Sequence, residues 1–346
     1  MTKKKHPLIF GSGLIALDIV LSGDASTPAR DWAGGTCGNV LAILAFLGWQ
    51  AYPVARLNGD PASQRVKADL KKWGVSLDYA ECAPTSHTPI IVQQIFRDGK
   101  GAAKHKFIWS CPSCGARLPS FQPVTANAVE CVLPALSGAS VFFFDRVSRA
   151  ILTMAEKASE EGAIIMFEPS GKGDPLLFKE AVQLAHILKY SRDRFTSIDG
   201  AMARGTNLMI EIQTLGKDGL RVRDKLNART SQWREKGAVH APLVIDTCGA
   251  GDWCTAGLIA TLGQGGEAGL KKGGKALLEK AIDYGQLLAA WNCGYEGARG
   301  GMYSAKTKTI LDAQVKHMKS GKSMRPKLSA PRRNQADLLA CPSCPS

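Results

Sequence analysis

The segment IDTCGAGDWCTAG (residues 245–257) sets a loop with almost no side chains between two acids. A Gly-Ala-Gly loop at the start of a helix exposes backbone N–H groups. Together with the helix dipole, these groups form an anion site suited to phosphate or a transferring phosphoryl group. Asp252 would repel a bound anion, but it is well placed to take a proton from a hydroxyl that attacks phosphorus. The segment therefore indicates phosphoryl transfer to an alcohol, although a simple tight turn needs the same glycines.

Two Cys-x-x-Cys pairs offer a second kind of chemistry. Cys111 and Cys114 lie in CPSCG, and Cys341 and Cys344 lie in CPSC. Four thiolates from two such pairs suit tetrahedral Zn²⁺. The pairs are much farther apart in the sequence than is usual, so one shared site requires the C-terminal segment to fold back onto residues 111–115. Free or redox-active thiols are the alternative, and the sequence leaves both open.

The elements that position these residues alternate between apolar strands and helical patterns. The predicted strands are 8–14, 89–96, 140–145, 163–169 and 207–216. The predicted helices are 39–49, 63–75, 149–162, 174–190, 253–262 and 274–293. This order predicts an α/β fold with a mostly parallel central sheet and helices on both faces. Because ligands bind at the carboxyl ends of such strands, we expect Asp145, Glu168 and the loop after Ile245 to gather at one edge.

Composition and charge narrow the class of protein. The chain has 346 residues, of which 45% are hydrophobic and 21% charged, as in ordinary globular proteins. No apolar run is long enough for a membrane helix, and the N-terminal run is better explained as a strand than as a signal peptide, so we expect a cytoplasmic protein. The last 46 residues carry nine Lys or Arg against two Asp, 9 − 2 = +7 of the formal +14. This tail predicts either a solvated basic segment or attraction to polyanions, although no nucleic-acid-binding motif accompanies it.

Four segments resemble, in the same order, the signatures of the ribokinase-like (PfkB) family of sugar and nucleoside kinases. They are AGGTCGNVLAILAFLGW (33–49), NGDPASQRVKADLKKWGV (58–75), TLGKDG (214–219) and DTCGAGD (246–252). The resemblance covers roughly residues 7–305. It implies a three-layer α/β/α fold with a mostly parallel central sheet and a small β lid. The kinase domain would span 1–320, with the lid formed by about 15–33 and 88–110, and 321–346 would be a basic tail that a zinc site would tether.

The resemblance also implies roles for individual residues. Asp252 would be the catalytic base, and the anion hole would consist of Gly249, Ala250 and Gly251. The substrate would lie against Asp18, Gly34, Gly35 and Asn39. The nucleotide side would include Thr214, Gly216 and Gly219, with Asn292 near the base and Asp246 nearer the phosphates and metal. Trp32, Phe107 and Trp109 would either belong to the lid or serve as ordinary packing aromatics.

The expected reaction is ATP-dependent phosphorylation of a hydroxymethyl group of a sugar or sugar-like substrate, with Mg²⁺. The alternatives are a nucleoside kinase, or a non-catalytic member of the family that binds a ligand or nucleic acid. Two departures from the family motivate the last alternative. The segment Ser191–Arg194 replaces an Asn-x-x-Glu that organises Mg²⁺, and Glu168–Lys172 replaces a frequent Asp-Pro-Asn-x-Arg. The family also suggests a homodimer formed through the lid.

Overall fold

The computed structural model describes residues 6–22, 29–57, 59–80, 86–97, 99, 103–227, 229–320 and 341–344. Some of the predicted features fall on residues outside these ranges. Asn58 of the second signature, positions 23–28 of the expected lid, and residues 321–340 and 345–346 of the basic tail lie outside the described residues.

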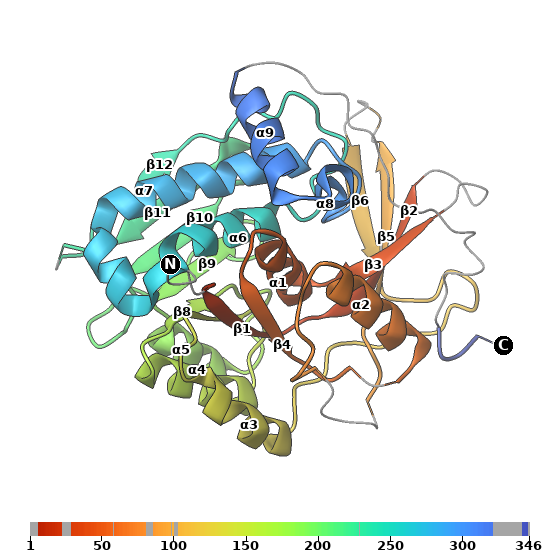
Figure 1. Ribbon diagram of the computed structural model, residues 1–346, viewed down its shortest axis with the longest axis horizontal. Coiled ribbons are helices and arrows are strands. Elements are labelled where there is room, and N and C mark those ends of the chain that lie inside the picture. The colour runs from red at the N-terminus through yellow and green to blue at the C-terminus, as the bar shows by residue number, and fades with distance from the viewer. Residues whose placement is uncertain are drawn as a thin grey trace, which may run out of the picture.

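A central sheet of eight strands forms the body of the molecule (Figure 1). Its order is β12 (Arg234–Lys236), β11 (Leu220–Asp224), β10 (Ile210–Thr214), β9 (Ile187–Ser191), β8 (Ile164–Phe167), β7 (Val141–Phe144), β1 (Leu8–Ser12) and β4 (Gln50–Val54). The pairings from β10 to β4 are parallel, and β11 and β12 add an antiparallel edge. The mostly parallel central sheet is confirmed.

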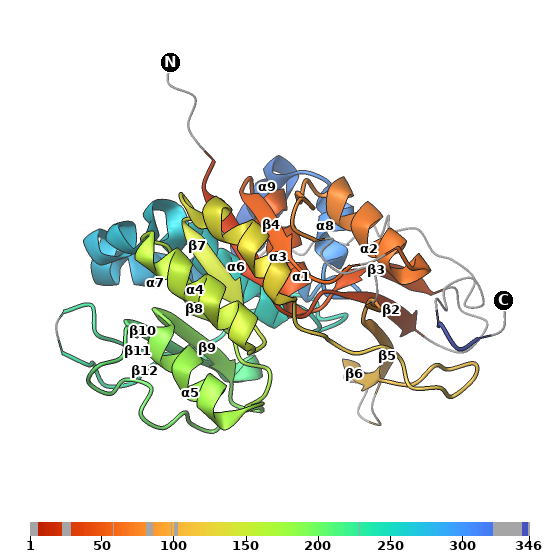
Figure 2. The ribbon, with the colours of Figure 1, turned by 90° about the horizontal axis from the view of Figure 1, so that it is seen from below.

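Helices cover both faces of this sheet, which makes three layers (Figure 2). One face carries α1 (Thr36–Phe46), α6 (Ala250–Leu262) and α7 (Gly266–Asn292), and the other carries α3 (Ala126–Val132), α4 (Arg149–Glu160) and α5 (Pro175–Leu184). Two further helices, α8 (Gly300–Ala305) and α9 (Lys308–Lys319), pack beside α7, and 3₁₀ turns occupy 133–136, 216–218 and 263–265. Alternate strand residues supply the two cores: Phe143 packs toward α6, whereas Phe142 and Phe144 pack toward α4.

The prediction of one helix over 174–190 is wrong. Helix α5 ends at Leu184, Ala185 is extended, and Ile187–Ser191 form the central strand β9 between β8 and β10. The run HILKY continues the apolar pattern of the helix before it, and a short apolar run fits a buried strand as well as a helix. The run forms a strand because its side chains are buried on both faces of the sheet. Leu188 and Tyr190 pack into one core, and Ile187 packs into the other.

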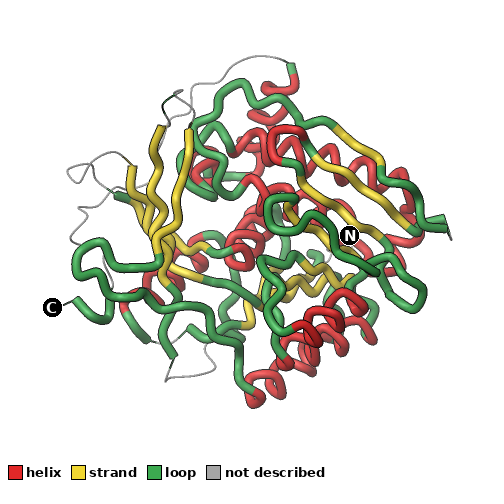
Figure 3. Tube along the Cα trace, turned by 180° about the vertical axis from the view of Figure 1, so that it is seen from behind, coloured by secondary structure: helices red, strands yellow, loops and turns green. Residues whose placement is uncertain are grey.

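A second, four-stranded sheet projects from one side of the body (Figure 3). Its order is β3 (Arg30–Gly34), β2 (Ala16–Ser22), β5 (Ile90–Arg97) and β6 (Ala103–Ile108). These strands come from the two ranges expected to form a lid, and α2 (Pro61–Lys72) packs against β2 and β3. Strand pairing puts Asp18, Gln93 and Phe107 on the same face of this sheet. We call it the lid sheet. Within the described residues, no helix has the length and apolar character needed to cross a membrane.

Candidate active site

The glycine loop forms the N-terminal end of α6, which begins at Ala250. Gly249 caps this helix in a left-handed conformation (φ 74°), and a Cβ there would lie 2.3 Å from the carbonyl oxygen of Ala298. Glycine is therefore required by conformation and by space. Gly251 is exposed, so the first N–H groups of the helix open toward solvent. The loop has the geometry of an anion site.

Asp252 lies in the first turn of α6 and is half-buried. The amide Nδ2 of Asn39 in α1 donates a hydrogen bond to its Oδ2 at 2.7 Å. Burial, helped by the negative charge of Glu168, raises the pKa of Asp252 to about 8, while the Asn39 bond and the charge of Lys189 oppose that rise. A carboxylate with a pKa near the working pH is an efficient proton acceptor.

Asn39 itself is oriented by residues that the sequence analysis missed. Nε of Arg299 donates to Oδ1 of Asn39 at 3.0 Å, and the Arg299 guanidinium pairs with Asp69 of α2 at 2.6 Å. Arg299 is fully buried, and Asp69 also accepts the hydroxyl of Tyr303. Both ends of the Asn39 amide therefore have a partner within the protein, one of them Asp252, and the place of Asn39 beside the substrate stays a prediction. An arginine isolated among the small residues of GARGG was the sequence signal for this network.

Asp18 lies on the lid sheet and faces the glycine pair 34–35. The N–H of Gly35 donates to its carboxylate, and a Cβ at Gly34 would collide with that carboxylate. Burial, opposed by Arg299, raises the pKa of Asp18 to about 7. Its Oδ1 is buried and has no hydrogen-bond partner among the described residues. This oxygen is therefore available to accept a hydrogen bond from water or from a ligand.

A buried ion pair stands behind the loop at the carboxyl ends of β8 and β9. Nζ of Lys189 lies 2.5 Å from Glu168, whose other oxygen accepts the hydroxyl of Thr255. Burial disfavours the ammonium, but Glu168 outweighs it, so the pKa of Lys189 stays above its usual value. A Cβ placed on Gly251 would lie 3.9 Å from this Nζ. Glu168 and Asp145 both influence Asp252, which confirms that the predicted strand-end acids gather with the loop.

Asp246 joins the loop to the lid sheet. The backbone N–H groups of Cys248 and Gly297 donate to it at 2.9 Å, and the buried amide of Gln93 on β5 donates at 3.0 Å. His105 of β6 lies 3.7 Å from its other oxygen. These contacts make Asp246 a link between the loop that carries Asp252 and the sheet that carries Asp18.

The residues expected along the nucleotide lie at the end of β10. Thr214 ends this strand, and Gly216 and Gly219 both have positive φ in the tight turn that follows. Arg192 donates from its backbone to the Thr214 carbonyl at 2.9 Å and pairs with Asp218 at 3.1 Å, with about half of both side chains exposed. The basic side chain of Arg192 thus borders this turn.

Two other predicted positions, Asn292 and Trp32, make their contacts inside the protein. Asn292 is fully buried; its amide donates to the Ala298 carbonyl at 3.0 Å and accepts from the N–H of Gly301. It therefore supports the loop that carries Arg299, and its predicted place near a nucleotide base gains no support from these contacts. Trp32 is buried and stacked on Tyr303, whereas Phe107 and Trp109 are exposed.

The sequence matches the model of the pfkB family carbohydrate kinases over residues 29–305. No curated protein matches the sequence. Solved structures of sugar and nucleoside kinases share the fold. Ribokinase from Arabidopsis thaliana, complexed with ribose and ATP, has a TM-score of 0.66 and 18% identity, covering 90% of this chain and 99% of its own.

Two more of these structures are similar to the same degree. A nucleoside kinase from Burkholderia thailandensis in complex with inosine has a TM-score of 0.64 and 18% identity, covering 92% of this chain and 99% of its own. Fructokinase from Xylella fastidiosa with bound ATP has a TM-score of 0.65 and 17% identity, covering 90% and 99%. At such identities the likeness establishes the three-layer fold, and the family match covers most of the chain. The chain belongs to the pfkB family of carbohydrate kinases.

Proposed function

We propose that this protein transfers the terminal phosphoryl group of ATP to a hydroxymethyl group of a sugar or sugar-like substrate. One observation carries the proposal. Asp252 lies in the first turn of α6, beside backbone N–H groups that suit a phosphoryl group, and its pKa of about 8 suits a proton acceptor. An anion site and a base in one helical turn provide what phosphoryl transfer to an alcohol requires.

The substrate would lie between the lid sheet and α6. The unpartnered Oδ1 of Asp18 would accept a hydroxyl of the substrate, while the hydroxymethyl group would face Asp252. Closure of the lid sheet over the substrate would exclude water, which would otherwise compete as the acceptor. The contacts of Asp246 with Gln93 and His105 would transmit the position of that sheet to the loop.

ATP and Mg²⁺ differ in how the described residues accommodate them. The open backbone at Gly251, backed by Lys189, fits a phosphate, and Thr214, Gly216 and Gly219 would border the nucleotide. For Mg²⁺, the segment 191–194 supplies one carboxylate, Asp193, between two arginines. Mg²⁺ commonly binds through one or two carboxylates together with substrate phosphates and water. The ion therefore fits here mainly as a partner of the phosphates, whose charge it would neutralise when bound.

The direct experiment is a phosphate-acceptor screen followed by substitution of the base. Purified protein is incubated with ATP, Mg²⁺ and a panel of sugars and nucleosides, and ADP formation is measured by chromatography. With the best acceptor, Asp252→Asn should bind substrate with nearly the affinity of the original protein and lose turnover. Asp312→Asn, an exposed acid on α9, is the control that keeps turnover. Near-normal turnover of Asp252→Asn would sink the assignment.

A nucleoside is the second candidate acceptor, because Phe107, whose exposed fraction is 42%, lies on the lid-sheet face that also carries Asp18. Aromatic rings of this kind stack on bases. Turnover with nucleosides and none with sugars would select it. If none of the acceptors in the panel supports ATP turnover and the protein binds nucleic acid in a salt-sensitive manner, a non-catalytic member of the family is favoured instead.

A further inference from the structure

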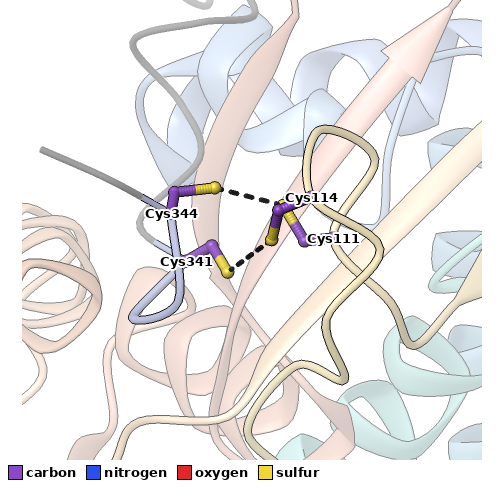
Figure 4. A group of neighbouring side chains, drawn as sticks. All are labelled: Cys111, Cys114, Cys341 and Cys344. Carbon is purple, nitrogen blue, oxygen red and sulfur yellow. Dashed lines mark hydrogen bonds between the residues drawn. The ribbon is translucent and has the colours of Figure 1, made fainter.

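The two Cys-x-x-Cys pairs meet in space although they lie at distant points of the chain. Figure 4 shows the four thiols pointing toward one another from two tight turns. All four sulfur atoms lie within 4.8 Å of one another. Sγ of Cys111 is 3.6 Å from that of Cys344, and Sγ of Cys114 is 3.8 Å from that of Cys341. Residues 341–344, which we call the C-terminal segment, therefore lie against the chain that follows the lid sheet.

These separations match a tetrahedral tetrathiolate site and not a pair of disulfides. A disulfide holds its sulfurs about 2.05 Å apart. With Zn–S bonds of about 2.3 Å, a regular tetrahedron places its sulfurs about 3.8 Å apart. The two measured pairs fall at or near that value. Two of the six sulfur separations thus have the tetrahedral spacing, and all six are at most 4.8 Å, so small shifts would place the four sulfurs around one metal ion.

The first turn also has the backbone of a metal knuckle. It closes a short hairpin in which Ser110 pairs with Arg117, and the Cys111 N–H donates to the Ala116 carbonyl at 2.7 Å. Gly115 has φ 74°, which lets the chain turn back after the second cysteine. Backbone N–H groups at 113 and 114 donate to the Cys111 sulfur. Such donors stabilise a thiolate, the form that binds metal.

The second turn offers the complementary half. The Cys344 N–H donates to the Cys341 carbonyl at 3.2 Å, so this pair also closes a single turn. Cys341 and Cys111 are buried, whereas Cys344 is partly exposed and Cys114 is exposed. One side of the cluster packs into the protein, and the other remains open for a metal ion to enter.

We propose that Cys111, Cys114, Cys341 and Cys344 bind one structural Zn²⁺, which fastens the C-terminal segment to the hairpin after β6. Binding forms four Zn–S bonds and releases the remaining thiol protons to solvent, with no change of oxidation state. Zn²⁺ is chosen because tetrahedral sites with four cysteines are its characteristic structural sites. This proposal is independent of the proposed reaction.

The ion would act on the lid sheet from outside the active site. The hairpin directly follows edge strand β6, and the chain just beyond it is bonded to β5, since the Ile90 N–H donates to the Pro119 carbonyl at 3.1 Å. The C-terminal segment would therefore brace both strands that carry Gln93 and His105.

The test is metal analysis of the full chain purified under reducing conditions from zinc-supplemented cells. The original protein should contain one zinc per chain by inductively coupled plasma mass spectrometry. Cys341→Ser and Cys344→Ser should each lose most of it, while Cys131→Ser, a change at an exposed cysteine of α3, should keep it. Cobalt substitution should give the intense visible spectrum of a tetrahedral tetrathiolate site in the control and not in Cys344→Ser.

The zinc content of the original protein tests the proposal even if a variant folds poorly. Zinc no higher than in Cys344→Ser would overturn the proposal. An intact mass lower by four hydrogens, with the four thiols resistant to alkylation, would replace it with two disulfides. One equivalent of iron instead of zinc would overturn the choice of ion. Release of zinc by a mercurial should lower the melting temperature, and an unchanged melting temperature would contradict a structural role.

Discussion

The bond between Asn39 and Asp252 gives a quantitative prediction for the variant Asn39→Leu. Leucine has nearly the size of asparagine but cannot donate to the carboxylate at 2.7 Å. That donor favours the ionised form of Asp252, so its loss must raise the pKa of the carboxyl above its present value of about 8. In the proposed reaction the base works only when ionised. The variant should therefore need a higher pH for the same rate.

The size of the effect follows from the strength of the bond. A hydrogen bond to a charged group contributes about 1.5–3 kcal/mol, and one pKa unit corresponds to about 1.4 kcal/mol. The pKa of Asp252 should thus rise by about 1 to 2 units. At pH 7 both proteins are mostly protonated at this carboxyl, so the ionised fraction, and with it kcat/KM, should fall about 10- to 100-fold. At about pH 10 the two proteins should differ by at most about twofold.

The assay is a pH profile of kcat/KM, with ADP separated by chromatography so that no coupling enzyme limits the alkaline range. Arg299→Lys is the matched control. It removes the Nε–H that bonds Asn39 but keeps a positive charge, and it leaves the Asn39 donor to Asp252 in place. Both variants should lose thermal stability, and only Asn39→Leu should shift the acid limb of the profile. A rate lowered equally at every pH, with the limb unmoved, would refute the reasoning.

Four further outcomes follow from the site. The pKa of Asp252 is raised above its unfolded value, so the folded state holds this proton more tightly and stability falls as pH rises from about 4 to about 8; Asp252→Asn should melt a few degrees higher at pH 8, with the gap closing near pH 4. Gly249→Ala should lower kcat by about 100-fold or more, because the new methyl displaces the anion loop. Asp18→Asn should raise KM for the acceptor about 10- to 100-fold in steady-state kinetics and leave KM for ATP unchanged. Gln93→Leu leaves the buried Asp246 short of one donor, so denaturant unfolding should show a loss of about 1–3 kcal/mol.

The sequence predicted the parts of the site that depend on local backbone chemistry. The glycines of CGAGD are required by the conformation of Gly249 and by the close approach of Ala298, and both constraints leave a readable mark in the sequence. The acids at the ends of β7 and β8 followed from the alternation of strands and helices. Such features need only a few consecutive residues, which is why they can be read before the fold is known.

The contacts that tune the site could not be read in that way. Asn39 meets Asp252 across 213 positions of sequence, and Arg299 meets Asp69 across 230. No local pattern specifies which polar side chain will face which, because packing of α1 against α6 and of α2 against the lid sheet brings them together. The misassigned strand β9 has a similar origin. Its apolar run became a strand because β8 and β10 were available on either side.

That strand also changes the meaning of the departure at Ser191–Arg194. As part of a helix, Lys189 would have had no defined relation to the loop at Gly251. As the third residue of β9, it is held by Glu168 at the carboxyl end of the sheet, where a Cβ on Gly251 would lie 3.9 Å from its Nζ. Glu168 Oε1 is equally near, at 4.0 Å from that Cβ, so the ammonium offsets a carboxylate that would otherwise repel an anion held by the loop. For the proposed reaction, Lys189 thus keeps the back of the loop close to neutral, and the charge of the transferring phosphoryl group is left to the loop N–H groups and to Mg²⁺.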